Sequence, residues 1–295
     1  MDAVRNEMDA VRIEQAAARP PERPVRHLER PAADAPHITG TTRLYAVLGD
    51  PVRQVRAPAL LNPVFARLGQ DAVLVPVEVG AAELPYVMRA LTAVRNLDGL
   101  LVTVPHKQAC HQLADSVTES AALSGSVNAL RRRPDGGWEG ANFDGEGFVR
   151  ALRGAGHEPR GTTVCLAGAG GAGSAIAVAL LRAGAHLTVW DADGPRASAL
   201  AARLAPHFPD RITAAPGHLD ARLAVNATPM GLRPEDPLPF NPAALAAGTT
   251  VADIIMKPRE TALLRAAAEA GLPVLYGEPM LAEQIALYEE FFQLG

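Results

Sequence analysis

The sequence predicts an α/β fold of two domains, with a cleft between them as the default ligand site. At 295 residues, the chain is long enough to form two cores. From Tyr45 onward, short apolar runs with strand character alternate with helical patterns, which is typical of parallel sheets. A hairpin-like stretch around 134–137 interrupts this alternation, and a second series begins at Thr163. The interruption divides the chain into two α/β domains.

The first 40 residues differ in composition from the rest of the chain. They are rich in Arg, Glu, Pro and Ala, and prolines between Pro20 and Pro36 interrupt any regular element. We expect residues 1–40 to be a disordered extension. The first domain would then occupy 41–145, completed by the closing helical segment 278–295, and the second domain would occupy 146–277.

Three strands, each followed by a helix, are expected in the first domain. The strands are Tyr45–Leu48, Val73–Val79 and Gly99–Val104, and the helices are Ala59–Leu68, Ala82–Val94 and His106–Asp115. Two more strands, Val127–Arg131 and Trp138–Asn142, flank the turn, and Phe148–Gly156 is predicted as a connecting helix.

The second domain repeats the alternation of strands and helices. The expected strands are Thr163–Ala167, His186–Trp190, Leu223–Asn226, Thr250–Ile255 and Val274–Tyr276. Helices are expected at about 172–183, 195–205 and 259–270, and the final helix at Pro279–Gln293.

Composition excludes several classes of protein. The formal net charge of −4 is unlike the basic excess of a general nucleic-acid binder. No uninterrupted apolar segment fits a signal peptide or a membrane span, so we expect a cytoplasmic protein. We expect it to be a monomer or a homodimer. The two cysteines, Cys110 and Cys165, fit a reducing compartment, and the histidines form no metal-binding set.

A glycine-rich turn opens the second domain. Gly168-Ala-Gly170-Gly171-Ala172-Gly173 follows a five-residue apolar strand and precedes an Ala-rich helix. Here glycine allows a tight turn, close approach of the backbone to a pyrophosphate, and close packing of helix and strand. The helix N-terminus would present free N–H groups to the phosphates. The turn therefore predicts a Rossmann-type dinucleotide site.

Asp191 follows the next predicted strand and indicates which dinucleotide is bound. Its carboxylate is placed to accept hydrogen bonds from both ribose hydroxyls, whereas a 2′-phosphate would be repelled by about 4 kcal/mol at ~4 Å. The following residues include no arginine before Arg196. We therefore predict NAD rather than NADP as the cofactor.

Polar residues end three apolar strands of the first domain. They lie in Val102-Thr103-Val104-Pro105-His106-Lys107, Val127-Asn128-Ala129-Leu130 and Asn142-Phe143-Asp144-Gly145. The carboxyl ends of parallel strands are where such sheets bind ligands. Lys107 is a natural proton donor and acceptor if a carboxylate holds it, and Asp144 is the candidate partner.

These strings together resemble the shikimate/quinate dehydrogenase family over residues 42–288. The other landmarks occur in the expected order: Gly49-Asp-Pro51, the glycine-rich turn, Asn226-Ala-Thr-Pro-Met-Gly231, Asp253…Lys257-Pro258, and Gly277…Met280…Gln284. The resemblance implies an N-terminal substrate domain, a Rossmann NAD-binding domain and a cleft between them. It also implies reversible oxidation of a secondary ring alcohol, in shikimate, quinate or a related cyclic polyol, to a ketone.

The resemblance also implies roles for individual residues. Lys107 and Asp144 match the catalytic pair, and Thr103, Asn128 and Gln284 match residues that bind the ring hydroxyls. The residues implied to border the nicotinamide are Asn226, Thr228, Met230, Gly277 and Met280.

The sequence departs from the family pattern where the substrate carboxylate would bind. Val55 and Ala57 stand in place of two serines, and Met256 in place of a tyrosine. Two nearby polar positions, an asparagine and a threonine, have become Leu101 and Phe143. Losing three hydrogen bonds to a charged group would cost about 4–9 kcal/mol, unless Arg53 or Arg56 binds the carboxylate. We select Arg56 as the candidate substrate contact, and a ring without the acid group remains an alternative.

A second class of function is also open, namely a catalytically silent NAD-binding sensor. The catalytic pair argues against this reading, because a sensor does not need groups for proton transfer.

Overall fold

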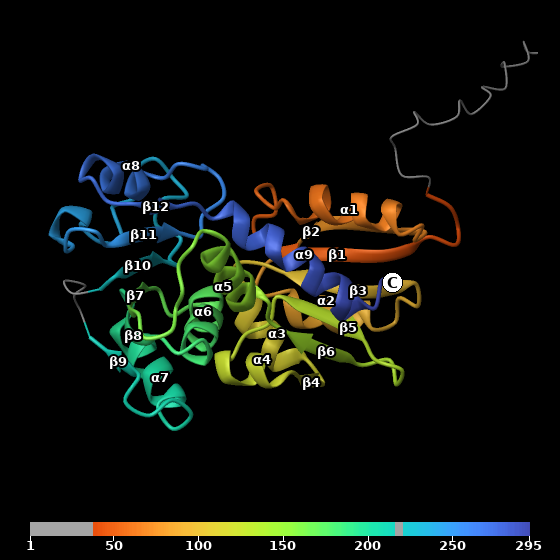
Figure 1. Ribbon diagram of the computed structural model, residues 1–295. Helices are drawn as coiled ribbons and strands as arrows, with labels where there is room; N and C mark the ends of the chain where they lie inside the picture. The colour runs from red at the N-terminus through yellow and green to blue at the C-terminus, as the bar shows by residue number, and fades with distance from the viewer. Residues whose placement is uncertain (1–37, 216–220) are drawn as a thin grey trace, which may run out of the picture. The chain divides into compact units, whose positions relative to one another are not determined.

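A computed structural model describes residues 38–215 and 221–295. Its described part contains two six-stranded sheets flanked by helices (Figure 1), so the predicted α/β fold is confirmed. Residues 1–37 of the extension predicted at 1–40 lie outside the described residues. The domain boundaries at 41–145 and 146–277 stay a prediction.

The first sheet is mixed, and its strands are ordered β2-β1-β3-β5-β6-β4. Parallel pairing joins β1 to β2 and to β3, whereas β5 is antiparallel to both β3 and β6. The strands are β1 (Arg43–Gly49), β2 (Ala72–Glu78), β3 (Leu97–Val102), β4 (Ser116–Val117), β5 (Ala129–Arg132) and β6 (Trp138–Ala141). The helices are α1 (Ala57–Arg67), α2 (Leu84–Leu91), α3 (Lys107–Leu113) and α4 (Glu119–Ser124).

The second sheet is parallel throughout, with the order β12-β11-β10-β7-β8-β9. Its strands are β7 (Thr163–Ala167), β8 (His186–Trp190), β9 (Ile212–Ala214), β10 (Leu223–Asn226), β11 (Thr250–Asp253) and β12 (Val274–Leu275). Around it lie α6 (Gly171–Arg182), α7 (Gly194–Leu204), α8 (Ala262–Glu269) and the short 3-10 helix η1 (Pro242–Ala244).

Two helices, α5 (Asp144–Gly154) and α9 (Glu278–Phe292), lie between the sheets (Figure 1). Glycines let α5 approach its neighbours closely. A Cβ at Gly145 would lie 2.1 Å from the carbonyl oxygen of Ala175 in α6, and one at Gly147 would lie 2.7 Å from Cγ of Gln284 in α9. The end of α9, including Phe292, packs in the apolar cluster that also holds Tyr45 of the first sheet.

Several elements differ from the sequence prediction, each for a local reason. The strand β4 and the helix α4 were not expected, because neither is long enough to show a period. The Thr118 hydroxyl caps α4 by accepting a hydrogen bond from the backbone of Ala121. The helix α8 begins at Ala262 instead of near 259, because the Thr261 hydroxyl caps it. The short elements β9 and η1 were also missed.

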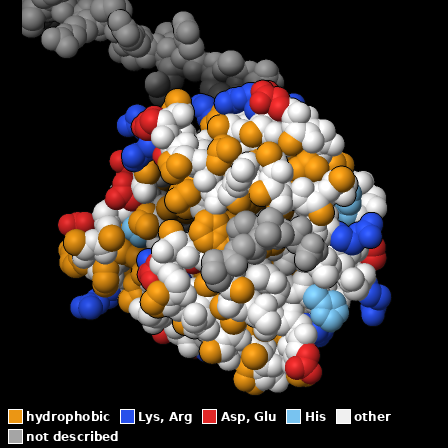
Figure 2. Space-filling model, turned by 90° about the vertical axis from the view of Figure 1, so that its left-hand side faces the viewer, with side chains coloured by type: hydrophobic (Ala, Val, Ile, Leu, Met, Phe, Trp, Pro, Cys, Tyr) orange, Lys and Arg blue, Asp and Glu red, His pale blue; other side chains and the backbone are white. Residues whose placement is uncertain are grey.

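Figure 2 shows the end of the second half that is turned away from the first sheet. On this face, hydrophobic side chains are scattered, and positive and negative side chains are interspersed around the rim. Such mixing of both signs matches the small net charge of the chain.

Candidate active site

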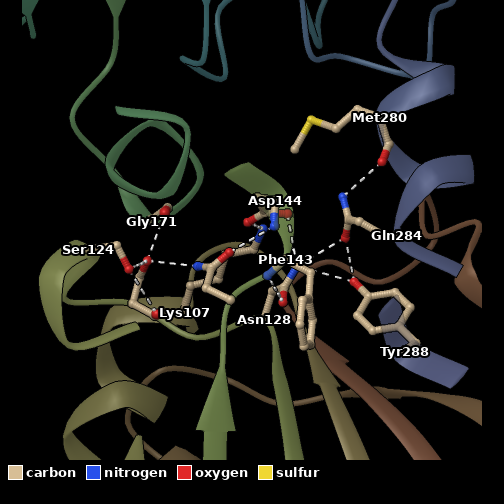
Figure 3. Close-up of polar contacts among 11 residues, drawn as sticks. Lys107, Ser124, Asn128, Phe143, Asp144, Gly171, Met280, Gln284 and Tyr288 are labelled. Atoms are coloured by element: carbon tan, nitrogen blue, oxygen red, sulfur yellow. Dashed lines mark hydrogen bonds and ion pairs between the residues drawn. The ribbon is translucent and has the colours of Figure 1, made fainter. Parts of the chain in front are cut away.

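Lys107 and Asp144 face each other at the ends of two elements (Figure 3). Lys107 is the first residue of α3, shortly after β3, and Asp144 is the first residue of α5. The Lys107 Nζ lies 2.5 Å from the Asp144 Oδ2, and the lysine side chain is 13% exposed. A partly buried ammonium that is held by a carboxylate is positioned to exchange a proton with a bound hydroxyl group.

Two amide side chains hold Asp144, one at its backbone N–H and one at its carboxylate. The Asp144 N–H donates to the Asn142 Oδ1, and Oδ1 of Asp144 accepts a hydrogen bond from the Asn128 Nδ2 at 3.0 Å. The carboxylate also lies in the first turn of α5, where the helix dipole stabilises negative charge. The two oxygens therefore have separate partners, the lysine on one and an amide on the other.

Asn128 connects the catalytic pair to α9. Its Nδ2 also lies 3.0 Å from the Gln284 Oε1 and 3.1 Å from the Tyr288 Oη, and its Oδ1 accepts from the Phe143 N–H. Asn128, Gln284 and Tyr288 form a buried group, here called the amide cluster (Figure 3). Sequence reasoning placed the two amides together but did not find Tyr288.

Thr103 follows β3 immediately and is partly buried. The preceding residue, Val102, donates its N–H to the Asn128 carbonyl, so Thr103 lies beside the strand end that carries Asn128. Its contact with a ring hydroxyl stays a prediction.

The glycine-rich turn lies directly against Lys107. A Cβ at Gly171 would lie 2.7 Å from the Cβ of Lys107, and the carbonyl oxygen of Gly171 accepts a hydrogen bond from the Ser126 hydroxyl at 2.8 Å. Ser126 in turn accepts from the Asn142 side chain. The turn that is expected to hold the dinucleotide thus touches the residue that is expected to transfer the proton.

The turn itself fits a pyrophosphate. Gly168 has a φ of +102°, which favours glycine, and a Cβ at Gly173 would lie 2.0 Å from the Gly168 carbonyl oxygen. At Gly170, which caps α6, no described atom lies within 4 Å of a Cβ placed there. Ala172 follows in the first turn of α6, where backbone N–H groups have no acceptor within the helix.

Asp191 is held beside the same turn. Its Oδ2 accepts from the Ala169 N–H at 2.7 Å, and its Oδ1 accepts from the Asp193 N–H at 2.9 Å. The next arginine, Arg196, forms an ion pair with Asp193. These bonds hold the carboxylate beside the glycine-rich turn, and its contact with a ribose stays a prediction.

The remaining residues expected near the nicotinamide lie at the end of β10 and in the loop after it, and at the start of α9. Asn226 is buried at the end of β10 and donates to the Met230 carbonyl and to the Asp253 carboxylate, while its Oδ1 accepts from Thr228. Burial raises the pKa of Asp253.

The second group lies at the start of α9. A Cβ at Gly277 would lie 2.6 Å from the backbone of Ile254, and Met280 lies one turn before Gln284 (Figure 3). A cavity of about 470 Å³ lies between α5, the ends of β11 and β12, and the start of α9, and both Gly277 and Met280 line it.

The comparisons with known proteins agree with this geometry. Residues 47–130 match the family model of the shikimate dehydrogenase substrate binding domain. A shikimate dehydrogenase (NADP(+)) from Rubrobacter xylanophilus is 42% identical over 258 residues, which cover 84% of this chain and 90% of that protein. The chain belongs to the shikimate dehydrogenase family.

Solved structures of related enzymes have the same fold. The 5-ketofructose reductase of Gluconobacter is 30% identical, with a TM-score of 0.73 and coverage of 85% of this chain and 92% of that one. The quinate dehydrogenase from Corynebacterium glutamicum, in complex with NAD, is 29% identical, with a TM-score of 0.73 and coverage of 86% and 93%. The chain is therefore an oxidoreductase of the shikimate dehydrogenase type that works with a nicotinamide cofactor.

The positions that the family pattern would use to bind a substrate carboxylate hold apolar side chains here. Val55 packs against the apolar cluster of the first sheet, and Ala57 is part of that cluster. Phe143 packs edge-on against Tyr288 and Phe291, with ring centroids at 5.6 and 5.3 Å. None of these side chains can bind an acid group.

Arg56 caps α1 beside these apolar positions, and its guanidinium has an acidic partner. Its Nη1 lies 2.6 Å from the Oε1 of Glu278, the first residue of α9, and Glu278 also pairs with Arg259. A substrate carboxylate would have to share the Arg56 guanidinium with Glu278.

Among residues 38–215 and 221–295, no group of three or more His, Cys, Asp or Glu side chains could hold a metal ion. No helix in the same ranges is long and apolar enough to span a bilayer.

Proposed function

We propose that the protein is an NAD-dependent dehydrogenase that interconverts a secondary alcohol on a polyhydroxylated ring and the corresponding ketone. The observation that carries this proposal is the contact between the Lys107–Asp144 pair and the glycine-rich turn through Gly171. A proton-transfer pair and a dinucleotide site are both needed for alcohol oxidation, and here they adjoin. We expect the enzyme to work in the cytoplasm, as a monomer or homodimer.

In the proposed reaction, bound NAD supplies the acceptor for the hydride from the carbinol carbon. The Lys107 amine takes the proton from the hydroxyl, and Asp144 stabilises the ammonium that results. In the reverse direction, the Lys107 ammonium returns the proton to the ketone oxygen. The amides of Asn128 and Gln284, with Thr103, orient the ring through its other hydroxyl groups.

The cofactor would be held by the second sheet. The N–H groups from Gly170 to Gly173, at the start of α6, would bind the pyrophosphate, with Gly168 making the turn before them, and Asp191 would bind the ribose hydroxyls. The related enzyme from Rubrobacter is named for NADP(+), but here a 2′-phosphate would face the Asp191 carboxylate. We therefore propose NAD as the preferred cofactor. The expected borders of the nicotinamide are Asn226, Thr228, Met230, Gly277 and Met280.

The substrate would be shikimate, quinate or a related cyclic polyol, and we favour a ring without a charged group. The apolar residues Val55 and Ala57 and the ion pair of Arg56 with Glu278 support this preference. The similarity to a reductase of 5-ketofructose, a sugar without a carboxylate, points the same way. An acidic ring would depend on Arg56 as its contact.

Turnover with a panel of ring alcohols tests the proposal. Shikimate, quinate and the decarboxylated analogue of shikimate would each be mixed with NAD or NADP, and formation of the reduced cofactor followed by absorbance. We expect NAD-linked turnover, which Lys107→Ala lowers by about 10²–10⁴-fold in kcat. Arg150→Ala, on the exposed face of α5, is the matched control.

Two results would contradict the proposal. Turnover that survives in Lys107→Ala would reject the assigned proton transfer. NAD binding without reduction by any ring alcohol would favour the catalytically silent sensor.

A further inference from the structure

Tyr288 is a buried polar residue beside the catalytic pair. It lies one helical turn after Gln284 on α9, on the same face, and is only 3% exposed. Its hydroxyl donates to the Gln284 Oε1 at 2.5 Å and accepts from the Asn128 Nδ2 at 3.1 Å (Figure 3). The phenol thus bonds to both amides that are expected to hold the ring hydroxyls.

The surrounding contacts hold the phenol itself in place. Its ring packs edge-on against Phe143 and at a tilt against Phe292, with ring centroids at 5.6 and 6.3 Å. Burial and the nearby Asp144 carboxylate raise the pKa of Tyr288 well above its ordinary value, so the hydroxyl keeps its proton. Tyr288 is therefore a fixed hydrogen-bond donor to Gln284.

This donor determines which group the Gln284 amide offers to a substrate. The Gln284 Oε1 accepts from both Tyr288 and Asn128, so both of its lone pairs are used inside the protein. The Gln284 Nε2 donates one hydrogen to the Met280 carbonyl and has a second N–H to offer. With its oxygen engaged in this way, Gln284 acts toward a ligand as a donor.

We propose that Tyr288 is a positioning residue that fixes Gln284 as a donor to a ring hydroxyl oxygen, and so determines affinity for a polyhydroxylated substrate. This inference rests on the proposed function. Without the phenol oxygen, the Gln284 carboxamide loses one of its two donors, and it can rotate to offer its oxygen in place of its N–H. Tyr288 would act through the amides and would not itself transfer a proton.

The test uses Tyr288→Phe, which removes only the hydroxyl. We expect the KM for the ring alcohol to rise by about 5–10-fold, the loss of roughly one hydrogen bond, while kcat, its pH profile and the KM for NAD change by less than about twofold. In the Gln284→Ala background, Tyr288→Phe should add no further rise in KM, because its effect passes through Gln284. Tyr45→Phe removes a phenol hydroxyl from the same apolar cluster and serves as the control.

A second readout does not depend on turnover. In ¹⁵N spectra of the full chain, the side-chain amide signals of Gln284 and Asn128 should shift in Tyr288→Phe and stay unchanged in Tyr45→Phe. Unchanged amide signals, an unchanged KM, or additive effects with Gln284→Ala would each overturn the inference. If the amide signals shift but no ring alcohol reduces NAD, the proposed function fails while the positioning role of Tyr288 stands.

Discussion

The two sides of the proposed substrate pocket differ in polarity. On one side, Lys107, Asp144 and the amide cluster form a buried polar network in which each described group has a protein partner. On the other side, near residues 55–57, the side chains are apolar or tied into a surface ion pair. The chemistry of the reaction and the choice of substrate therefore reside in separate elements, so one can change while the other is kept.

The largest expected effect comes from breaking the polar side. In Asp144→Asn the shape of the side chain is kept, but Lys107 loses the charge that stabilises its ammonium. We expect kcat to fall by about 10²–10³-fold, measured by stopped-flow absorbance of the reduced cofactor. Asp135→Asn, in the exposed hairpin turn, is the control. A kcat within threefold of the wild type, in a folded variant, would show that the carboxylate is not needed.

Replacement of Asp191 tests whether this carboxylate determines the choice between NAD and NADP. Asp191→Ser removes the charge that a 2′-phosphate would face, so the ratio of kcat/KM for NAD to that for NADP should fall by about 100-fold, within the ~4 kcal/mol expected from Coulomb repulsion. Initial rates with both cofactors measure this ratio. Equal use of the two cofactors by the wild type would exclude the proposed preference.

Polar groups can be restored on the apolar side of the pocket. The double substitution Val55→Ser with Ala57→Ser supplies two hydroxyls where a carboxylate would lie. Since one hydrogen bond to a charged group contributes about 1.5–3 kcal/mol, even a single new bond should raise kcat/KM for shikimate by about 10–100-fold. Turnover of the decarboxylated analogue should change little. A gain of the same size for both substrates would mean that the hydroxyls act without recognising the acid.

The smallest effect is expected at the cysteines, which belong to neither side. Burial raises the pKa of both Cys110 and Cys165 to about 12. Because only the thiolate is alkylated and it forms above the pKa, the native protein at pH 8 should keep its activity in iodoacetamide. After denaturation, mass spectrometry should find two modified cysteines. Rapid alkylation of the native protein would contradict the burial of the thiols.

The predicted fold followed from periodicity wherever an element was long enough to show it. The strands Thr163–Ala167 and His186–Trp190 were predicted at the residues where the structure has them. By contrast, α5 was expected to begin at Phe148 but begins at Asp144. Its first turn contains Gly145 and Gly147, which carry no side chains to reveal a buried face, so the apolar pattern starts a turn late.

The parts of the candidate site that could be predicted from the sequence were those at strand ends and in the glycine-rich turn. Lys107 and Asp144 were paired because both follow strands of one sheet. Tyr288 was missed, although its spacing of four from Gln284 placed it on the same helix face. The ion pair of Arg56 with Glu278 joins residues 222 positions apart, and no local pattern indicates it.

The closeness of α5 to its neighbours limits how this enzyme can diversify. A single added methyl group at Gly145 or Gly147 would collide with α6 or α9, so the helix that begins with Asp144 tolerates almost no drift in sequence or position. The loop before α1 is under no such restriction. New substrates would therefore be acquired by remodelling that loop, around a reaction centre that the crowded helices hold constant.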